Sequence, residues 1–166
     1  MKIINRLLVL WQTFVNYLSR LILGHSMYKN IRVTPKVYLG GAFTQRKIKL
    51  LKKWGITAVV SMRMVTPPVG IKTLHLPTRD YHAPTDEDLI TGVEFIEKEV
   101  KNGGKVYVHC RAGVGRGPTM VIAYLISTGY TLSEAIELIK KVRNFINPTE
   151  EQMESLRMFA EKTNKA

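Results

Sequence analysis

What the sequence lacks limits what this 166-residue chain can be. Cys110 is the only cysteine, which excludes an internal disulfide and fits a reducing compartment such as the cytoplasm. The histidines are scattered without the spacing of a zinc site: they are His25, His75, His82 and His109. We therefore expect a protein that works without a disulfide, a bound metal or another cofactor.

Acidic residues are missing from the whole first half, since none occurs before Asp80. Residues 1–79 carry a charge of +14 and residues 80–166 a charge of −2, which together make the net +12. This asymmetry favours contact with an anionic membrane, with nucleic acid or with phosphorylated substrates, although a merely solvated basic surface is the alternative. No nucleic-acid partner is expected, because the basic residues are not interleaved with an aromatic platform or a helix-turn-helix pattern.

Residues 2–23 lack the long apolar run of a membrane-spanning helix. Their longest uninterrupted apolar stretch is Leu7–Trp11, and Arg6 and Arg20 fall inside the segment. The apolar residues instead recur with helical spacing on one face, which predicts an amphipathic helix. It either lies in the plane of an anionic membrane or packs on the rest of the protein. The aromatic and basic side chains favour the membrane.

After this segment, strand and helix patterns alternate and then give way to consecutive helices. We predict a helix and connector at 1–30 and one globular domain at 31–166. Its fold is expected to be α/β, with a central mixed, mostly parallel sheet flanked by helices. The predicted strands lie at 31–34, 37–39, 56–61, 71–76 and 105–109. The predicted helices begin at or after Thr44, Thr85, Pro118, Thr131 and Thr149, the last two with capping boxes completed by Glu134 and Gln152.

The most informative stretch is residues 105–119, Lys-Val-Tyr-Val-His-Cys-Arg-Ala-Gly-Val-Gly-Arg-Gly-Pro-Thr. A buried strand leads into a glycine-bearing turn and then into a helix with Pro118 in its first turn. Backbone N–H groups at such a helix N-terminus converge on one point, where the helix dipole adds positive charge, so the turn predicts an anion site. The residues predicted to bind phosphate are Arg111, Ala112, Gly113, Val114, Gly115 and Arg116.

Cys110 begins this turn and is the predicted nucleophile. Converging N–H dipoles and nearby arginines favour a thiolate over a thiol at neutral pH. The alternative is that Cys110 is a small hydrophobic residue of the core. The combination of a preceding strand, a glycine-bearing turn that ends in an arginine, and a following helix argues against that interpretation. Thiolate attack on a phosphate ester requires an acid for the departing oxygen. Asp80, 30 residues before Cys110 in a loop after a strand, is the best candidate, with a turn-forming aspartate as the alternative.

The stretch His109–Arg116 resembles the signature of the cysteine-dependent protein tyrosine phosphatase superfamily, and the short chain points to its dual-specificity branch. The similarity runs from about Val37 to the C-terminus and extends to the mitochondrial phosphatidylglycerophosphate phosphatase group. It implies that His109 holds the loop and tunes the thiolate, although a core histidine is the alternative. Relatives usually carry Ser or Thr where this chain has Gly117, and their hydroxyl helps the thiolate leave the phosphoenzyme. Thr119 is counted as a supporting residue without assuming that it substitutes.

This resemblance implies a phosphatase that forms a phosphocysteine intermediate. The leading hypothesis is a dual-specificity protein phosphatase acting on phosphotyrosine and phosphoserine or phosphothreonine. The first alternative is a phospholipid phosphatase that works on phosphatidylglycerophosphate or phosphoinositides at a membrane surface, which the basic first half favours. The second is a phosphate-binding pseudophosphatase, which the presence of Cys110, Arg116 and Asp80 argues against. We expect a reducing cytoplasmic location, with peripheral membrane contact through residues 2–23.

Overall fold

A computed structural model describes Trp11, Phe14, Val15 and residues 31–163 of the chain. The predicted amphipathic helix at 2–23 otherwise lies outside the described residues. In the described part of the chain, no helix is both long and apolar enough to cross a membrane. A five-stranded sheet in the order β1-β2-β5-β3-β4 forms the centre, in which β1 is antiparallel to β2 and the other neighbours are parallel. The strands are β1 (Ile31–Arg32), β2 (Val37–Gly40), β3 (Ala58–Ser61), β4 (Lys72–His75) and β5 (Val106–His109).

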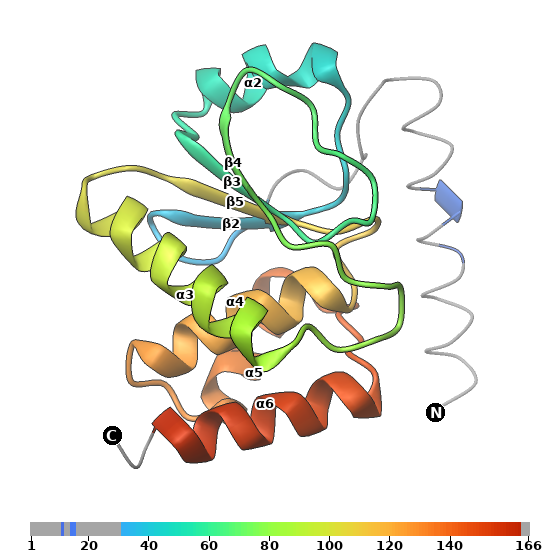
Figure 1. The fold of residues 1–166 in the computed structure, drawn as a ribbon, viewed down its shortest axis with the longest axis vertical. Coiled ribbons are helices and arrows are strands. Elements are labelled where there is room, and N and C mark those ends of the chain that lie inside the picture. Colours follow the sequence, from blue (N-terminus) through green and yellow to red (C-terminus); the bar gives the residue numbers. More distant parts are fainter. Residues whose placement is uncertain (1–10, 12–13, 16–30, 164–166) are drawn as a thin grey trace.

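Helices cover both faces of this sheet (Figure 1). One face carries the short 3₁₀ turn η1 (Gln45–Lys47) and α2 (Ile48–Lys53). The other face carries α3 (Asp86–Lys101), α4 (Arg116–Ser127), α5 (Leu132–Val142) and α6 (Glu150–Thr163). The predicted α/β fold with a mixed, mostly parallel sheet flanked by helices is confirmed.

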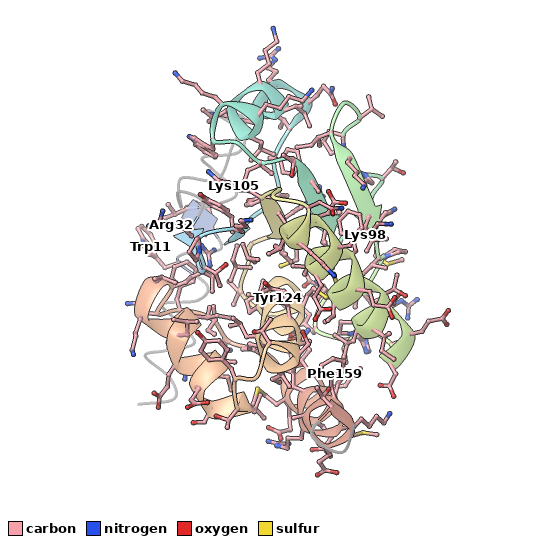
Figure 2. All side chains as sticks on the ribbon, turned by 90° about the vertical axis from the view of Figure 1, so that its left-hand side faces the viewer. Trp11, Arg32, Lys98, Lys105, Tyr124 and Phe159 are labelled. Carbon is pink, nitrogen blue, oxygen red and sulfur yellow. The ribbon has the colours of Figure 1, made fainter. Side chains whose placement is uncertain are left out.

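Alternation along the strands divides the apolar side chains between the two faces, since neighbouring residues of a strand point in opposite directions. Val59 and Tyr107 pack with the residues of α2, whereas Val60 and Val108 pack with those of α4. Helix α4 contacts β2, β5, α3, α5 and α6, so nearly its entire surface is buried. Tyr124 of α4, labelled in Figure 2, lies among these helices near the middle of the molecule.

Capping residues predicted from the sequence begin two of the helices. Thr85 accepts a hydrogen bond from the backbone N of Asp88 at the start of α3, and a full capping box of Thr131 and Glu134 opens α5. The helix predicted from Thr44 differs in its first turn. Its backbone there is 3₁₀, with an i to i+3 hydrogen bond from Lys47 N to the Thr44 carbonyl, before α2 continues as an α-helix.

The register of the sheet places the predicted site at its carboxyl edge. Gly40, Ser61, His75 and His109 end their strands level with one another across the parallel part of the sheet. The strand that carries His109 lies between two parallel neighbours, β2 and β3. Cys110 therefore leaves the sheet at the middle of the edge where ligands bind in open α/β folds.

Candidate active site

The loop after β5 turns its carbonyl groups outward. Four consecutive carbonyl oxygens accept hydrogen bonds from groups outside the loop. These bonds run from Ala42 N to Arg111 O (3.0 Å), Arg143 Nη2 to Ala112 O (2.7 Å), Arg143 Nε to Gly113 O (2.8 Å) and Asn147 N to Val114 O (2.8 Å). In a planar trans peptide the N–H points opposite to the C=O, so the amides of residues 112–115 are turned to the inner side of the loop. This is the arrangement that an anion site requires.

Cys110 lies at the inner side of this loop and is only 3% exposed. Its Sγ accepts a hydrogen bond from the backbone N of Gly113 (3.2 Å), which stabilises negative charge on the sulfur. Gly113 has a φ of +70°, and a Cβ there would lie 2.6 Å from the Gly40 carbonyl oxygen. A glycine is therefore required for the backbone to bring this N–H to the sulfur.

Arg116, the first residue of α4, is 4% exposed and binds two segments of the chain. Its Nη1 donates to the carbonyls of Met62 (3.2 Å) and Thr78 (2.7 Å), and its Nη2 lies 2.7 Å from Asp80 Oδ1. Its Nε is buried and makes no hydrogen bond with the described residues. The predicted phosphate-binding arginine thus holds the predicted acid directly and retains a buried donor.

A hollow of about 130 Å³ brings most of the predicted site together. It is lined by Asp80, Tyr81, Cys110, Arg111, Ala112, Val114, Gly115, Asn147, Thr149 and Gln152. Two predicted phosphate-binding residues do not line it. Gly113 donates its backbone N–H to the sulfur, and Arg116 reaches the site through Asp80. The predicted nucleophile and the predicted acid therefore share one small hollow at the sheet edge.

The loop that carries Asp80 is tied to the start of α6. Thr149 Oγ1 donates to the Tyr81 carbonyl (2.9 Å), and Gln152 Nε2 donates to the His82 carbonyl (2.8 Å). Tyr81 itself has a φ of +70°, which is a strained backbone for a non-glycine residue, and its side chain is 75% exposed at the rim. The sequence predicted Gln152 only as a helix cap, a role that it also fills by accepting from Thr149 N.

His109 is 1% exposed and lies behind the loop in a group of aromatic rings. Its ring stacks on that of Tyr107, with centroids 5.6 Å apart, and contacts Phe43 at 4.9 Å. Its Nδ1 lies 3.2 Å from the Cys110 carbonyl oxygen. Burial raises the pKa of Tyr107, whose hydroxyl stays neutral and donates to the Gly41 carbonyl (2.5 Å). His109 is thus placed to position the backbone that carries the sulfur.

Thr119 is fully buried in α4, one turn after the loop. Its hydroxyl donates to the Gly115 carbonyl (3.0 Å). This bond fixes the last peptide of the loop onto the helix, and it directs the Thr119 hydroxyl to the backbone.

Arg143, directly after α5, is a residue of the site that sequence reasoning missed. It is 1% exposed, its guanidinium lies 4.3 Å from the Phe145 ring centroid, and it bonds the Ala112 and Gly113 carbonyls. It follows Gly113 by 30 residues with no pattern linking the two, so the sequence alone contains no signal for this contact.

Replacing Arg143 with methionine should weaken both the fold and the anion site. Methionine keeps much of the apolar length but removes two charge-assisted hydrogen bonds, each worth roughly 1.5–3 kcal/mol. We expect urea unfolding to show a loss of about 3–5 kcal/mol and phosphate to bind more weakly. Arg157→Met, which removes an exposed arginine paired with Glu150 and Glu154, is the matched control and should change little. Equal behaviour of the two variants would contradict this role.

Gly117 lies close enough to the sulfur for a serine there to act on it. A Cβ at position 117 would lie 3.7 Å from Cys110 Sγ and 3.1 Å from Leu39 Cδ1, a flexible side-chain end that can yield. Gly117→Ser should then donate a hydrogen bond to the departing thiolate. We expect phosphoenzyme hydrolysis to accelerate about ten- to hundredfold, the kinetic equivalent of one bond to a charged group.

Rapid-mixing kinetics with p-nitrophenyl phosphate measure this step. When hydrolysis of the phosphoenzyme is slow, a burst of p-nitrophenol release precedes the steady state. Gly117→Ser should reduce the burst and raise the steady-state rate. Gly117→Ala adds the same Cβ without the hydroxyl and should leave the rate of the second step as in the parent chain. Acceleration by alanine as well as serine would show that the hydroxyl is not responsible.

A cysteine at the floor of an anion-binding loop, with an arginine and an aspartate beside it, defines the class of phosphatases that use a cysteine nucleophile. Comparison with known proteins agrees with this class. The dual specificity phosphatase catalytic domain matches residues 37–162, and the chain belongs to this family.

Three similar proteins illustrate the relationship. Dual specificity protein phosphatase 5 of Rattus norvegicus is 36% identical over 123 residues, which cover 71% of this chain and 32% of that protein. Phosphatidylglycerophosphatase and protein-tyrosine phosphatase 1 of Rattus norvegicus is 44% identical over 93 residues, covering 55% of this chain and 48% of that protein. The crystal structure of PTPMT1 has a TM-score of 0.75 at 31% identity, covering 82% of this chain and 96% of that one. The chain therefore spans between a third and a half of the length of the two sequence relatives.

Proposed function

We propose that this chain hydrolyses phosphate monoesters of proteins through a phosphocysteine intermediate, and that it accepts phosphotyrosine as well as phosphoserine and phosphothreonine. The observation that carries the proposal is the shared hollow, which Cys110 and Asp80 line together with residues of the loop after β5. A nucleophile, an anion site and an acid in one place are the three parts that phosphoryl transfer to a thiol requires.

In the first step the Cys110 thiolate attacks phosphorus. A sulfur–phosphorus bond forms while the bond from phosphorus to the ester oxygen breaks. The inward amides and the Arg116 guanidinium stabilise the charge on the transferred group. Asp80 donates its proton to the departing oxygen, so that an alcohol or phenol leaves instead of an alkoxide or phenoxide.

The bond between Arg116 and Asp80 explains how the acid is released for this step. A phosphate dianion in the loop competes with Asp80 for the guanidinium, because both offer oxygens to the same donors. Once displaced from Arg116, Asp80 faces the ester oxygen that receives its proton. The buried Arg116 Nε supplies a second donor to the phosphate.

In the second step water attacks the phosphocysteine. Asp80, now ionised, takes a proton from the water, the oxygen–phosphorus bond forms and the sulfur–phosphorus bond breaks. Inorganic phosphate leaves and the thiolate is restored. Because that thiolate must stay reduced between turnovers, we place the activity in a reducing compartment, the cytoplasm.

The size of the hollow supports a broad choice of phosphoamino acid. At about 130 Å³ it is far smaller than the ~300–1,000 Å³ of pockets that enclose drug-sized ligands. It has room for a phosphoryl group, whereas the remainder of the substrate lies at the rim formed by Tyr81 and Asn147. Selectivity between aromatic and aliphatic phosphoesters then rests on rim contacts alone.

Phospholipid hydrolysis is the second candidate. It is favoured by the 44% identity to a protein that is named both a phosphatidylglycerophosphatase and a protein-tyrosine phosphatase, and by the absence of acidic residues before Asp80. A phosphorylated headgroup presents the same monoester to the loop as a phosphoprotein does.

Phosphate release from matched substrates tests the two candidates. The full-length chain would be given phosphotyrosyl and phosphothreonyl peptides, and phosphatidylglycerophosphate and phosphoinositides in anionic vesicles. Higher kcat/KM on peptides, unaffected by vesicles and by removal of residues 1–24, supports the protein phosphatase. Higher efficiency on lipids, lost with that truncation, overturns it in favour of the membrane-surface enzyme. Binding without turnover on every substrate would indicate a pseudophosphatase.

A further inference from the structure

The surface formed by η1, α2 and the loop at 63–70 is both strongly basic and apolar. We propose that this surface, here called the α2 surface, docks on an anionic lipid bilayer. The proposal concerns residues outside the catalytic hollow, and it is independent of the predicted helix at 2–23. It is tested by binding alone, so its failure would leave the proposed phosphatase activity in place.

The charge of the α2 surface has one sign only. Between Gln45 and Arg79 the chain carries eight Lys and Arg residues and no acid. Helix α2 and the 3₁₀ turn before it contribute five of them: Arg46, Lys47, Lys49, Lys52 and Lys53. Side chains with nitrogen ends project outward from α2 at the top of Figure 2, away from the end of the molecule that carries α6. This face is therefore attracted to an anionic surface.

Exposed apolar side chains lie on the loop that joins β3 to β4. In the loop after β3, Met64 is 58% exposed, Val65 57% and Val69 75%. A hydrogen bond from Gln45 Nε2 to the Val69 carbonyl (2.8 Å) holds the loop against η1. Basic and aliphatic groups are thus fixed on adjacent elements, which is the composition of surfaces that bind membranes in the interfacial plane.

Two open hollows lie where the loop meets α2, of about 430 and 550 Å³. Lys52 and Gly70 line both of them, and Lys49 and Arg46 line the larger. Each is a recess with a cationic wall, which suits the phosphate of a lipid headgroup beneath the aliphatic loop.

A bilayer fits this surface better than an acidic peptide does. An acidic peptide would neutralise the lysines but leave Met64, Val65 and Val69 exposed to water. A bilayer accepts both, with the cations at the headgroups and the aliphatic groups at the acyl boundary. The loop also begins next to the active site, since the Met62 carbonyl binds Arg116 Nη1 (3.2 Å). The loop therefore connects the α2 surface directly to the residues that hold Arg116.

Co-sedimentation with vesicles tests the proposal on the full-length chain, using phosphatidylcholine with and without phosphatidylglycerol. Each Lys near an anionic surface contributes about fivefold to binding, so the triple variant K49Q/K52Q/K53Q should bind roughly a hundredfold more weakly. The matched control is K98Q/K140Q/K141Q, which removes the same charge from α3 and α5 on the other face of the sheet. It should bind nearly as the parent chain does.

The aliphatic part is tested by M64S/V65S/V69S, which keeps every charge and should weaken binding about tenfold or more. Turnover of p-nitrophenyl phosphate should be unchanged in all three variants, which shows that they are folded. Binding of either α2-surface variant as tight as that of the control would overturn the proposal. So would tight binding to soluble polyglutamate that survives the serine substitutions, because that result would define an acidic-peptide site.

Discussion

Replacing Cys110 with serine is expected to lower kcat by a factor on the order of 10⁴–10⁶, the range seen when a covalent nucleophile is removed. A serine hydroxyl remains protonated at neutral pH and is a much weaker nucleophile than a thiolate. The geometry that binds the phosphate is unaffected, because the inward amides depend on outward carbonyl bonds and not on the sulfur. Substrate affinity should therefore stay within a few fold of that of the parent chain.

The two quantities are measured separately. Phosphopeptide binding by calorimetry gives the affinity, and phosphate release gives the turnover. A phosphocysteine trapped by rapid acid quench should appear in the parent chain and be missing from Cys110→Ser. Unchanged turnover in the serine variant would rule out the thiolate mechanism. Loss of binding together with turnover would mean that the sulfur also maintains the loop.

The features that sequence predicted correctly are local ones. The fold class, the strand before the loop and the caps at Thr85 and Thr131 follow from periodicity and from residues a few positions apart. The prediction of an anion-binding loop also rests on a local pattern, the nine residues from Cys110 to Pro118. The loop's need for glycine at position 113 has a physical cause in the positive φ and in the approach of Gly40.

The features that sequence could not predict depend on contacts between distant segments. Arg143 reaches the loop carbonyls from the end of α5, and Gln152 reaches the His82 carbonyl across 70 residues. In the sequence Arg143 appears as one of many basic residues and Gln152 appears as a helix cap. Their second roles exist only because α4 packs against both α5 and α6 and brings their ends to the loop.

The loop that carries Asp80 is consequently held from two sides. Arg116 binds Asp80 and the Thr78 carbonyl from the sheet side, while Thr149 and Gln152 bind the next two carbonyls from α6. Such a loop needs little rearrangement to present its carboxyl group to a substrate, so its contribution to catalysis should be that of a preorganised acid. This expectation can be tested at the carboxyl group itself.

Asp80→Asn removes the transferable proton while keeping the shape of the side chain. General acid catalysis is worth about 10²–10⁴ in rate, so kcat should fall by that factor on phosphoserine and phosphothreonine peptides, whose alkoxides leave poorly. The loss should be much smaller on p-nitrophenyl phosphate, because p-nitrophenolate leaves without help. A plot of rate against leaving-group basicity should be steeper for the variant than for the parent chain.

The same substitution frees Arg116 from its anionic partner, which lies 2.7 Å away in the parent chain. Inorganic phosphate should therefore inhibit Asp80→Asn at lower concentrations than it inhibits the parent chain, even though turnover is lower. Asp86→Asn is the matched control, because Asp86 pairs with Lys162 outside the hollow and should alter neither quantity. An equal loss of rate on all leaving groups, with weaker phosphate inhibition, would mean that Asp80 only supports the loop and that another group supplies the proton.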